Sequence, residues 1–139
     1  MIHVAHHSTR PNSPVFAPGS PGARIHPDAA PDVGEPVVIK HTPGAFHGTG
    51  LEALLEELEV TEVAIGGFMT HMCCESTARE AAARGMRVLV LEDATATRDV
   101  KAPDGTTIPH HQLHRMSLAA LGDGLARIVT AQELMGGAS

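Results

Sequence analysis

Short apolar runs alternate with amphipathic stretches along most of this chain. Residues 36–40 read PVVIK and residues 86–93 read MRVLVLED. Continuous apolar runs of this length are typical of strands that are buried on both faces of a parallel sheet. Similar runs predict further strands at Thr61–Gly67, Met1–Ala5 and Leu125–Val129. The last two would be the first and the last strand in chain order.

Helical spacing separates these apolar runs. Apolar side chains recur at i, i+3, i+4 and i+7 after residue 50, which places them on one helical face: Leu51, Leu54, Leu55 and Leu58. A second helix is expected from about Cys73 to Gly85. A third begins near Pro109, a favourable first helical residue, with an apolar face formed by Leu113, Met116, Ala120 and Leu121.

Polar residues at the helix ends and on the exposed faces support these boundaries. Thr49 with Glu52, and Thr130 with Glu133, have the spacing of capping boxes, in which each side chain satisfies a backbone N–H of the other residue. Ion pairs at i, i+4 are expected on the exposed side of the second helix, between Glu75 and Arg79 and between Glu80 and Arg84.

The regular alternation of strands and helices predicts an α/β fold with a mostly parallel sheet and right-handed crossovers. In such sheets the active site lies at the carboxyl ends of the strands. We therefore expect Lys40, the Gly67–Cys73 turn and the Asp93–Arg98 loop to lie along one edge.

The segment from Arg10 to Pro36 interrupts the alternation. It is rich in Pro and Gly, and it is longer than the roughly 12–15 residues usual for a loop without secondary structure. We expect residues 10–36 to be a lid or a subunit contact. The remaining elements predict a single domain over residues 1–139.

Composition excludes several classes of protein. The formal net charge is −6, and the 10 Lys and Arg residues are scattered, which argues against nucleic-acid binding. Because no stretch has 18 apolar residues, we expect no membrane span. The two cysteines are adjacent in sequence and therefore a poor disulfide pair, so we expect a reduced, cytoplasmic setting.

Cys73 lies at the expected start of a helix. Free N–H groups and the helix dipole favour an anion there, and Lys40 at a neighbouring strand end would add a positive charge. This arrangement indicates acyl transfer by a thiolate. Two other interpretations stay open: both cysteines pack in the core, or Cys73 and Cys74 form a redox sensor.

Three segments resemble the isochorismatase-like cysteine hydrolases, a family that includes nicotinamidases and carbamoylases. They are GFMTHMCCESTAREAAARGMRVLVLEDATATRD, VVIKHTPGAFHGTGLEALL and QLHRMSL. The resemblance extends from Ile2 to about Val129. It implies a three-layer α/β/α fold of Rossmann type and the hydrolysis of a small-molecule amide or related C–N bond through a Cys73 thioester.

The resemblance also implies roles for single residues. Cys73 follows Thr70 by three positions and would be the nucleophile, with Cys74 as a packing residue. Lys40 would stabilise charge, and the backbone N–H groups of Met69 and Cys73 would form the oxyanion hole. The Phe68–Met69 peptide bond would be cis. The implied substrate pocket contains Phe46, His71 and Thr70, although a core position is equally compatible with Phe46.

One part of the family pattern is missing. The family triad is Asp, Lys and Cys, and its Asp lies on a first, central strand that this sequence lacks. The sequence leaves four explanations open: a truncated chain, a misplaced start, a strand supplied by a partner chain, or an inactive protein. Asp93 is the only nearby carboxylate that could replace the triad Asp. In the family, an acidic residue at this position looks structural.

We expect no metal and no cofactor. His6 and His7 lack the preceding Asp of the family's metal-binding motif, and His111 and His114 share a helix face without further ligands. Arg98 is a candidate contact for a substrate carboxylate. The alternative interpretation is that Arg98 forms a salt bridge within its loop, with Asp99 or Asp93.

The resemblance implies a small-molecule substrate and a homo-oligomer, either a dimer or a tetramer. The alternative function is a non-catalytic relative that binds a small molecule or a partner chain.

Overall fold

The computed structural model describes residues 1–10 and 12–136. In that part of the chain, seven β-strands and four α-helices follow one another. The strands are β1 (His3–His6), β2 (Val37–Lys40), β3 (Glu62–Phe68), β4 (Arg87–Ala96), β5 (Val100–Lys101), β6 (Thr107–Ile108) and β7 (Arg127–Val129). The α-helices are α1 (Leu51–Glu57), α2 (Glu75–Ala83), α3 (His110–Gly122) and α4 (Ala131–Gly136).

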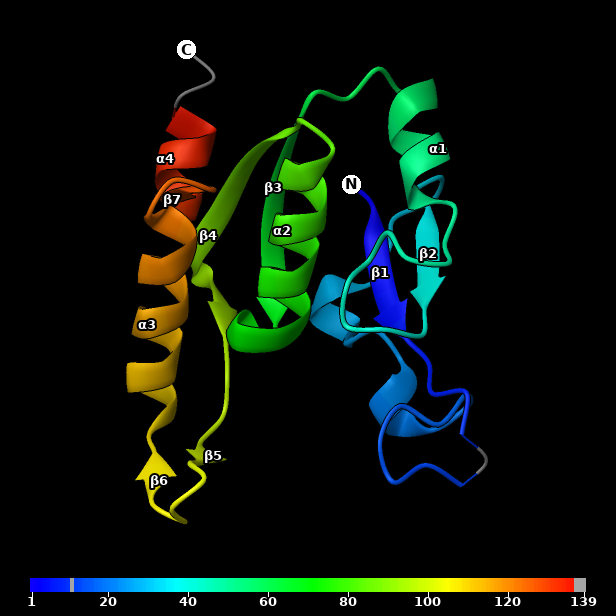
Figure 1. Ribbon diagram of the computed structural model, residues 1–139. Coiled ribbons are helices and arrows are strands. Elements are labelled where there is room, and N and C mark those ends of the chain that lie inside the picture. The colour runs from blue at the N-terminus through cyan, green and yellow to red at the C-terminus, as the bar shows by residue number, and fades with distance from the viewer. Residues whose placement is uncertain (11, 137–139) are drawn as a thin grey trace.

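The strands form two parallel sheets and one small hairpin. β1 pairs with β2, while β3, β4 and β7 form a second sheet in that order. β5 and β6 pair in antiparallel fashion beside the start of α3. The arrowheads of β1, β2 and β3 point the same way in Figure 1, so the carboxyl ends of both sheets lie at the same end of the molecule. The predicted α/β class with a mostly parallel sheet is confirmed.

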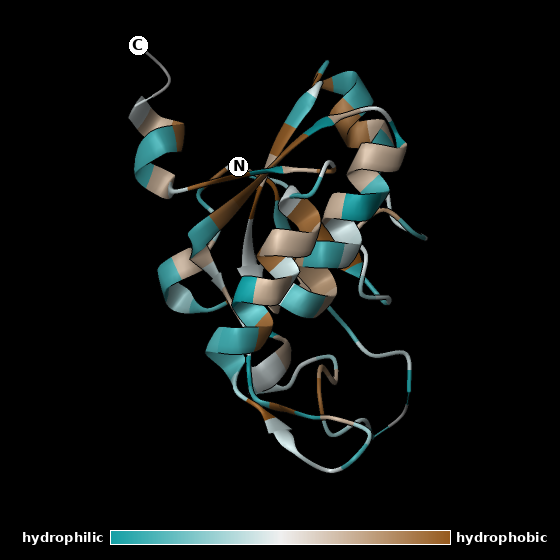
Figure 2. Ribbon diagram, turned by 60° about the vertical axis from the view of Figure 1, so that its left-hand side comes forward, coloured by the Kyte–Doolittle hydropathy of each residue, from teal (hydrophilic) through white to brown (hydrophobic). Residues whose placement is uncertain are grey.

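Both sheets contribute to a single hydrophobic core. Val38 from β2, Leu55 from α1, Ala78 from α2, Val90 from β4 and Leu121 from α3 belong to one buried cluster. α2 lies in front of β3 in Figure 1, and Figure 2 shows helices that alternate between hydrophobic and hydrophilic turns beside largely apolar strands. Apolar burial at this shared core is what holds the two sheets together, because no ladder of hydrogen bonds joins β1 to β3 in the described residues.

The edges of β1 and β3 are therefore open. Several apolar side chains on the parallel strands stay exposed, including Val4 at 39%, Ile39 at 39% and Phe68 at 75%. Unpaired strand edges and exposed apolar side chains are features that proteins normally cover. The expectation that a first strand is missing stays a prediction.

The Arg10–Pro36 segment contains little regular structure in its described residues. It forms two short 3₁₀ turns at Pro21–Ala23 and Pro27–Ala29, and Ala23 is buried. Its first part folds back on β1, because the Ser8 N–H donates to the Phe16 carbonyl at 2.7 Å. The expected role as a lid or subunit contact stays a prediction.

Two of the local predictions fail for identifiable reasons. Thr49 and Glu52 form no capping box: the N-cap is Gly50, and the Glu52 carboxylate pairs with Arg84 at 3.0 Å. Glu80 does not pair with Arg84, because its carboxylate accepts the Phe46 N–H at 3.0 Å. In both cases a partner from a distant segment competes successfully with the local one.

The third helix is rotated relative to its predicted face. Met116 is 64% exposed, whereas Ser117, Leu118 and Leu121 are buried. The apolar spacing did not reveal this because a polar residue, Ser117, lies on the buried face. The Glu75–Arg79 pair and the reciprocal hydrogen bonds between Thr130 and Glu133 are confirmed.

Candidate active site

The connection from β3 to α2 has an unusual backbone. Gly67 has φ of +122°, a conformation that strongly favours glycine. The Phe68–Met69 peptide bond that follows is cis, as the family resemblance implied. A π-helical turn at Thr70–Cys74 then leads into α2, which begins at Glu75. Cys73 therefore lies in the π-helical turn and not in the first turn of the α-helix. π-helical turns of this kind occur frequently at functional sites.

The two cysteines in this turn have different surroundings. Cys74 is 4% exposed, and burial raises the pKa of its thiol to about 12, with a smaller upward contribution from Cys73. Cys74 therefore stays a protonated packing group at neutral pH. Cys73 is only half-buried and not in a disulfide. Of the two thiols, Cys73 is the one that a small molecule can reach.

Lys40 ends β2 as a buried cation. Its side chain is 4% exposed, and its Nζ donates to the Pro43 carbonyl. Its positive charge acts to lower the pKa of Cys74, which places the ammonium within electrostatic range of the turn. No carboxylate forms an ion pair with Lys40 among residues 1–10 and 12–136. A buried ammonium without a counter-ion is costly and is common at functional sites.

Two histidine–threonine hydrogen bonds hold the turn. Thr70 is fully buried, and its Oγ1 lies 2.8 Å from Nδ1 of His114 on α3. His71 Nδ1 lies 2.5 Å from Oγ1 of Thr97, just after β4. Burial and then the charge of Arg98 lower the pKa of His71. Sequence spacing did not indicate the bond between Thr70 and His114, because these residues are 44 positions apart.

The other candidates lie in more ordinary surroundings. Phe46 is 4% exposed and belongs to the core, with the Arg84 guanidinium 4.4 Å above its ring. Asp93 accepts the Ala131 N–H at 2.8 Å and thereby caps α4, which favours a structural role over that of a substitute base. Arg98 donates to the Asp99 carbonyl and forms no salt bridge with Asp99 or Asp93.

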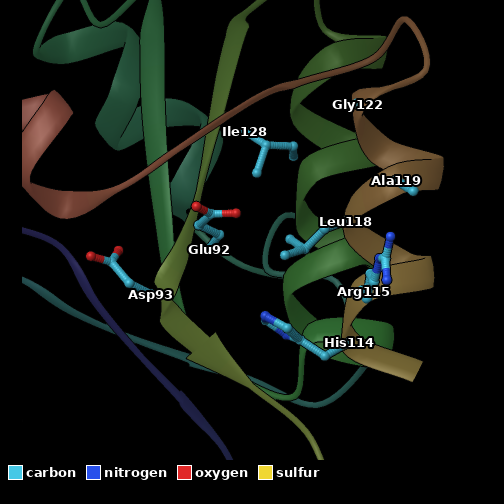
Figure 3. Close-up of a pocket in the computed structure, with 8 residues that line it drawn as sticks. All are labelled: Glu92, Asp93, His114, Arg115, Leu118, Ala119, Gly122 and Ile128. Carbon is cyan, nitrogen blue, oxygen red and sulfur yellow. The ribbon is translucent and has the colours of Figure 1, made fainter. Parts of the chain in front are cut away.

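A groove of about 670 Å³ lies between α3 and the strands β4 and β7. Figure 3 shows Glu92 on one side and Arg115 and Leu118 on the other, with His114 at its lower end. His114 is the member of the groove that also touches the Cys73 turn, through Thr70. The groove itself contains neither cysteine nor Lys40.

The described residues contain neither a metal cluster nor a membrane-spanning helix. No three His, Cys, Asp or Glu side chains converge there in a geometry that would hold a metal ion. No described helix has both the length and the apolar composition needed to cross a bilayer.

Comparison with known proteins defines the class to which this fold and site belong. The isochorismatase domain family matches residues 1–133, and the chain belongs to that family. The chain is 35% identical to a secreted isochorismatase effector of Verticillium dahliae, over 96% of this chain and 67% of the relative. It is 40% identical to nicotinamidase 3 of Arabidopsis thaliana, over 70% of this chain and 44% of the relative.

The solved structures agree on the fold. A crystal structure of an isochorismatase hydrolase from Oleispira antarctica superposes with a TM-score of 0.91 at 39% identity, covering 98% of this chain and 71% of that one. This similarity confirms the isochorismatase-like, three-layer α/β/α architecture.

Proposed function

We propose that this protein hydrolyses a small-molecule amide or a related C–N bond through a thioester on Cys73. The observation that carries the proposal is the environment of this thiol. Cys73 is half-buried and lies in a π-helical turn next to Cys74, whose pKa is raised by burial and lowered in part by the charge of the buried Lys40. Family membership supports a hydrolase, and the nicotinamidase relative supports an amide as the scissile bond.

The proposed chemistry proceeds in two steps. The Cys73 thiolate attacks the carbonyl carbon, and the developing oxyanion accepts hydrogen bonds from the backbone N–H groups of Met69 and Cys73. The intermediate collapses by breaking the C–N bond, and the amine leaves with a proton. Water then attacks the thioester, which releases the carboxylic acid and regenerates the thiol. Lys40 stabilises the negative charge, and His71 borders the substrate. The fully buried Thr70 positions the turn through its hydrogen bond with His114.

The leaving amine needs a proton, and full turnover depends on a group that supplies it. The family triad uses an Asp, and within the described residues no carboxylate pairs with Lys40. We propose that a carboxylate from outside these residues, or from a second chain, completes the triad. Loss of a general acid–base group typically slows a reaction by roughly 10²–10⁴-fold. Without this carboxylate, the protein would acylate slowly and accumulate the thioester.

Intact-mass analysis after incubation with a panel of small amides tests this function. We expect an adduct on Cys73 whose mass equals that of the acyl group, and loss of the adduct in Cys73→Ser. Cys74→Ala is the matched control and should keep the adduct. If no amide in the panel forms an adduct and Cys73 reacts with thiol reagents no faster than a free peptide cysteine, the proposed function is wrong.

The buried, unpaired Lys40 also favours a second candidate. A relative without a general base can bind a small molecule or a partner chain without cleaving anything. Saturable binding of an amide, measured by calorimetry, with no adduct in wild type and equal affinity in Cys73→Ser, would support this alternative.

We also propose that the protein self-associates as a dimer or tetramer, because the edges of β1 and β3 are open. Light scattering after size-exclusion chromatography measures the oligomeric state directly. A monomer at all concentrations would contradict the proposal.

A further inference from the structure

The groove between α3, β4 and β7 has an apolar floor. Five of its lining residues follow one face of α3: His114, Arg115, Leu118, Ala119 and Gly122. Leu118 belongs to the hydrophobic core, and Ile128 of β7 lies opposite the helix. A Cβ atom on Gly122 would lie 3.3 Å from Cγ1 of Ile128, so α3 approaches β7 closely and closes one end of the groove. Its volume of about 670 Å³ is within the roughly 300–1,000 Å³ usual for small-molecule sites.

Opposite charges line the two walls of this groove. Figure 3 shows Glu92 pointing from β4 toward α3, whereas Asp93 points the other way and accepts the Ala131 N–H. Arg115 lies on the α3 side. Within residues 1–10 and 12–136, Glu92 and Arg115 form no ion pair, either with each other or with another side chain. A complementary occupant carries an ammonium toward Glu92 and a carboxylate toward Arg115, joined by an apolar chain.

His114 connects the groove to the turn that carries Cys73. Its Nδ1 lies 2.8 Å from Oγ1 of the fully buried Thr70. Its Nε2 has no partner in the described part of the chain and is not one of the buried unsatisfied atoms there, so it reaches solvent at the end of the groove. A neutral imidazole carries its proton on one nitrogen only. A carboxylate at Nε2 therefore holds the proton on that nitrogen and makes Nδ1 the acceptor of the Thr70 hydroxyl.

We propose that the groove is an effector site for a small zwitterion whose ammonium and carboxylate are separated by an apolar chain, as in an ω-amino acid. Glu92 pairs with the ammonium, Arg115 and His114 bind the carboxylate, and the apolar floor contacts the chain. The bound carboxylate keeps the hydrogen bond between His114 and Thr70 made, and thereby holds the Cys73 turn in its reactive geometry. The inference goes beyond the proposed function, because the groove contains none of the residues assigned to cleavage of the C–N bond.

NMR spectroscopy tests binding, since the chain has no Trp or Tyr for a fluorescence assay. The methyl signals of Leu118 and Ile128 are followed during titration with 6-aminohexanoate, hexanoate and hexylamine, which share a six-carbon chain and differ in their charged ends. We expect saturable shifts with all three. 6-Aminohexanoate should bind about fivefold more tightly than either of the others, the largest factor usual for one exposed ion pair. Equal affinities for the three, or no saturable shift of these methyl signals, would overturn the inference.

Variants that remove one charge test the two walls separately. Glu92→Gln should weaken 6-aminohexanoate by about fivefold and leave hexanoate unchanged. Arg115→Gln should weaken hexanoate and leave hexylamine unchanged. Glu57→Gln and Arg24→Gln are the matched controls, because they remove the same charges at exposed positions outside the groove. An equal loss of affinity in the controls would reveal a general effect of net charge and would overturn the site.

Alkylation of Cys73 by iodoacetamide measures the effect on the turn and does not require turnover. With saturating 6-aminohexanoate, we expect alkylation to become about fivefold faster, at the lower end of typical coupling between two sites. Hexylamine lacks the carboxylate and should not accelerate it. His114→Asn keeps a polar atom near the position of Nδ1 for Thr70 but removes Nε2, and should abolish the acceleration, whereas the exposed control His111→Gln should retain it. An unchanged rate, or equal acceleration in His114→Asn, would overturn the effect on Cys73.

These outcomes separate the effector site from the proposed function. Charge-dependent binding in the groove, with no acyl adduct from any amide, would refute the hydrolase and leave the effector site standing. An acyl adduct on Cys73 without charge-dependent shifts of the groove methyl signals would support the hydrolase and refute the effector site.

Discussion

The turn that carries Cys73 and the strand ends that carry His6 and Lys40 differ in how completely their polar groups are satisfied. Thr70 and His71 each have a partner from a distant element, in α3 and after β4. At the ends of β1 and β2, a buried ammonium has no counter-ion and a buried imidazole nitrogen has no partner among the described residues. The described residues satisfy the polar groups of the first region, whereas they leave those of the second region unsatisfied.

This difference separates two tasks within one site. A nucleophile must be held in one geometry, which requires rotamers locked by packing and hydrogen bonds. Polar groups that are buried without partners cost free energy, and the folded protein bears that cost in stability. Substitutions in the first region should therefore reduce stability and reactivity together. Substitutions in the second region break fewer contacts and should change stability less.

The largest effect is expected at the two cysteines. Cys73→Ser should abolish labelling by iodoacetamide at neutral pH, because Cys74 is buried and keeps its proton with a pKa of about 12. Cys74→Ala should retain labelling. Peptide mapping of the alkylated protein measures both. Labelling of Cys74 at a rate similar to that of Cys73 would show that the turn opens and that the two thiols are not distinguished by burial.

The next effect concerns the hydrogen bond between Thr70 and His114. Thr70→Val removes the hydroxyl from a fully buried site and leaves His114 Nδ1 without its partner. We expect a loss of roughly 1–3 kcal/mol in the free energy of unfolding and slower alkylation of Cys73. Urea denaturation measures the former. His111→Gln, on the exposed side of the same helix, is the control and should change neither quantity.

A loss of about 1–3 kcal/mol in the free energy of unfolding is expected at Gly44, because an added Cβ would displace the Glu80 carboxylate and leave the buried Phe46 N–H without its acceptor. A Cβ atom there would lie 2.2 Å from the Glu80 carboxylate, which bonds the Phe46 N–H. Gly44→Ala should lower the unfolding midpoint and shift the loop between Lys40 and α1. Gly22→Ala has no atom within 4 Å of the added Cβ and should be nearly neutral. Equal effects for the two variants would remove Glu80 as the cause.

The smallest effect is the dependence of stability on pH. The pKa values of His6 and His71 are lowered from 6.5, chiefly by burial. Protons therefore bind the unfolded chain more readily, so this stability is present in full above pH 6.5 and is lost as the pH falls below that value. Thermal unfolding should show a falling midpoint on acidification below pH 6.5. His6→Phe should flatten that slope, and His7→Gln should not. An unchanged slope in His6→Phe would exclude His6 as a contributor.

The sequence by itself determined the order and type of the main elements. Apolar runs such as PVVIK and MRVLVLED predicted strands, and their alternation with helices favoured a parallel sheet. The expected burial on both faces was wrong for β2, where Val37 and Ile39 stay exposed. The motif around Cys73 was also legible, including the cis bond after Phe68. The strands and helices depend on neighbouring residues, so local spacing is enough to reveal them. The cis bond was implied by the family resemblance and not by spacing.

Only the tertiary structure decided which polar groups meet. The Thr70–His114 bond, the Glu80–Phe46 bond and the stacking of Phe16 on His6 join residues far apart in the chain. Another distant contact, the ion pair of Arg84 with Glu52, took the place of the predicted Thr49–Glu52 box. Apolar burial is non-directional and can be read from a pattern. A hydrogen bond requires two particular atoms to lie about 3 Å apart, and that condition is set only when the whole chain has packed.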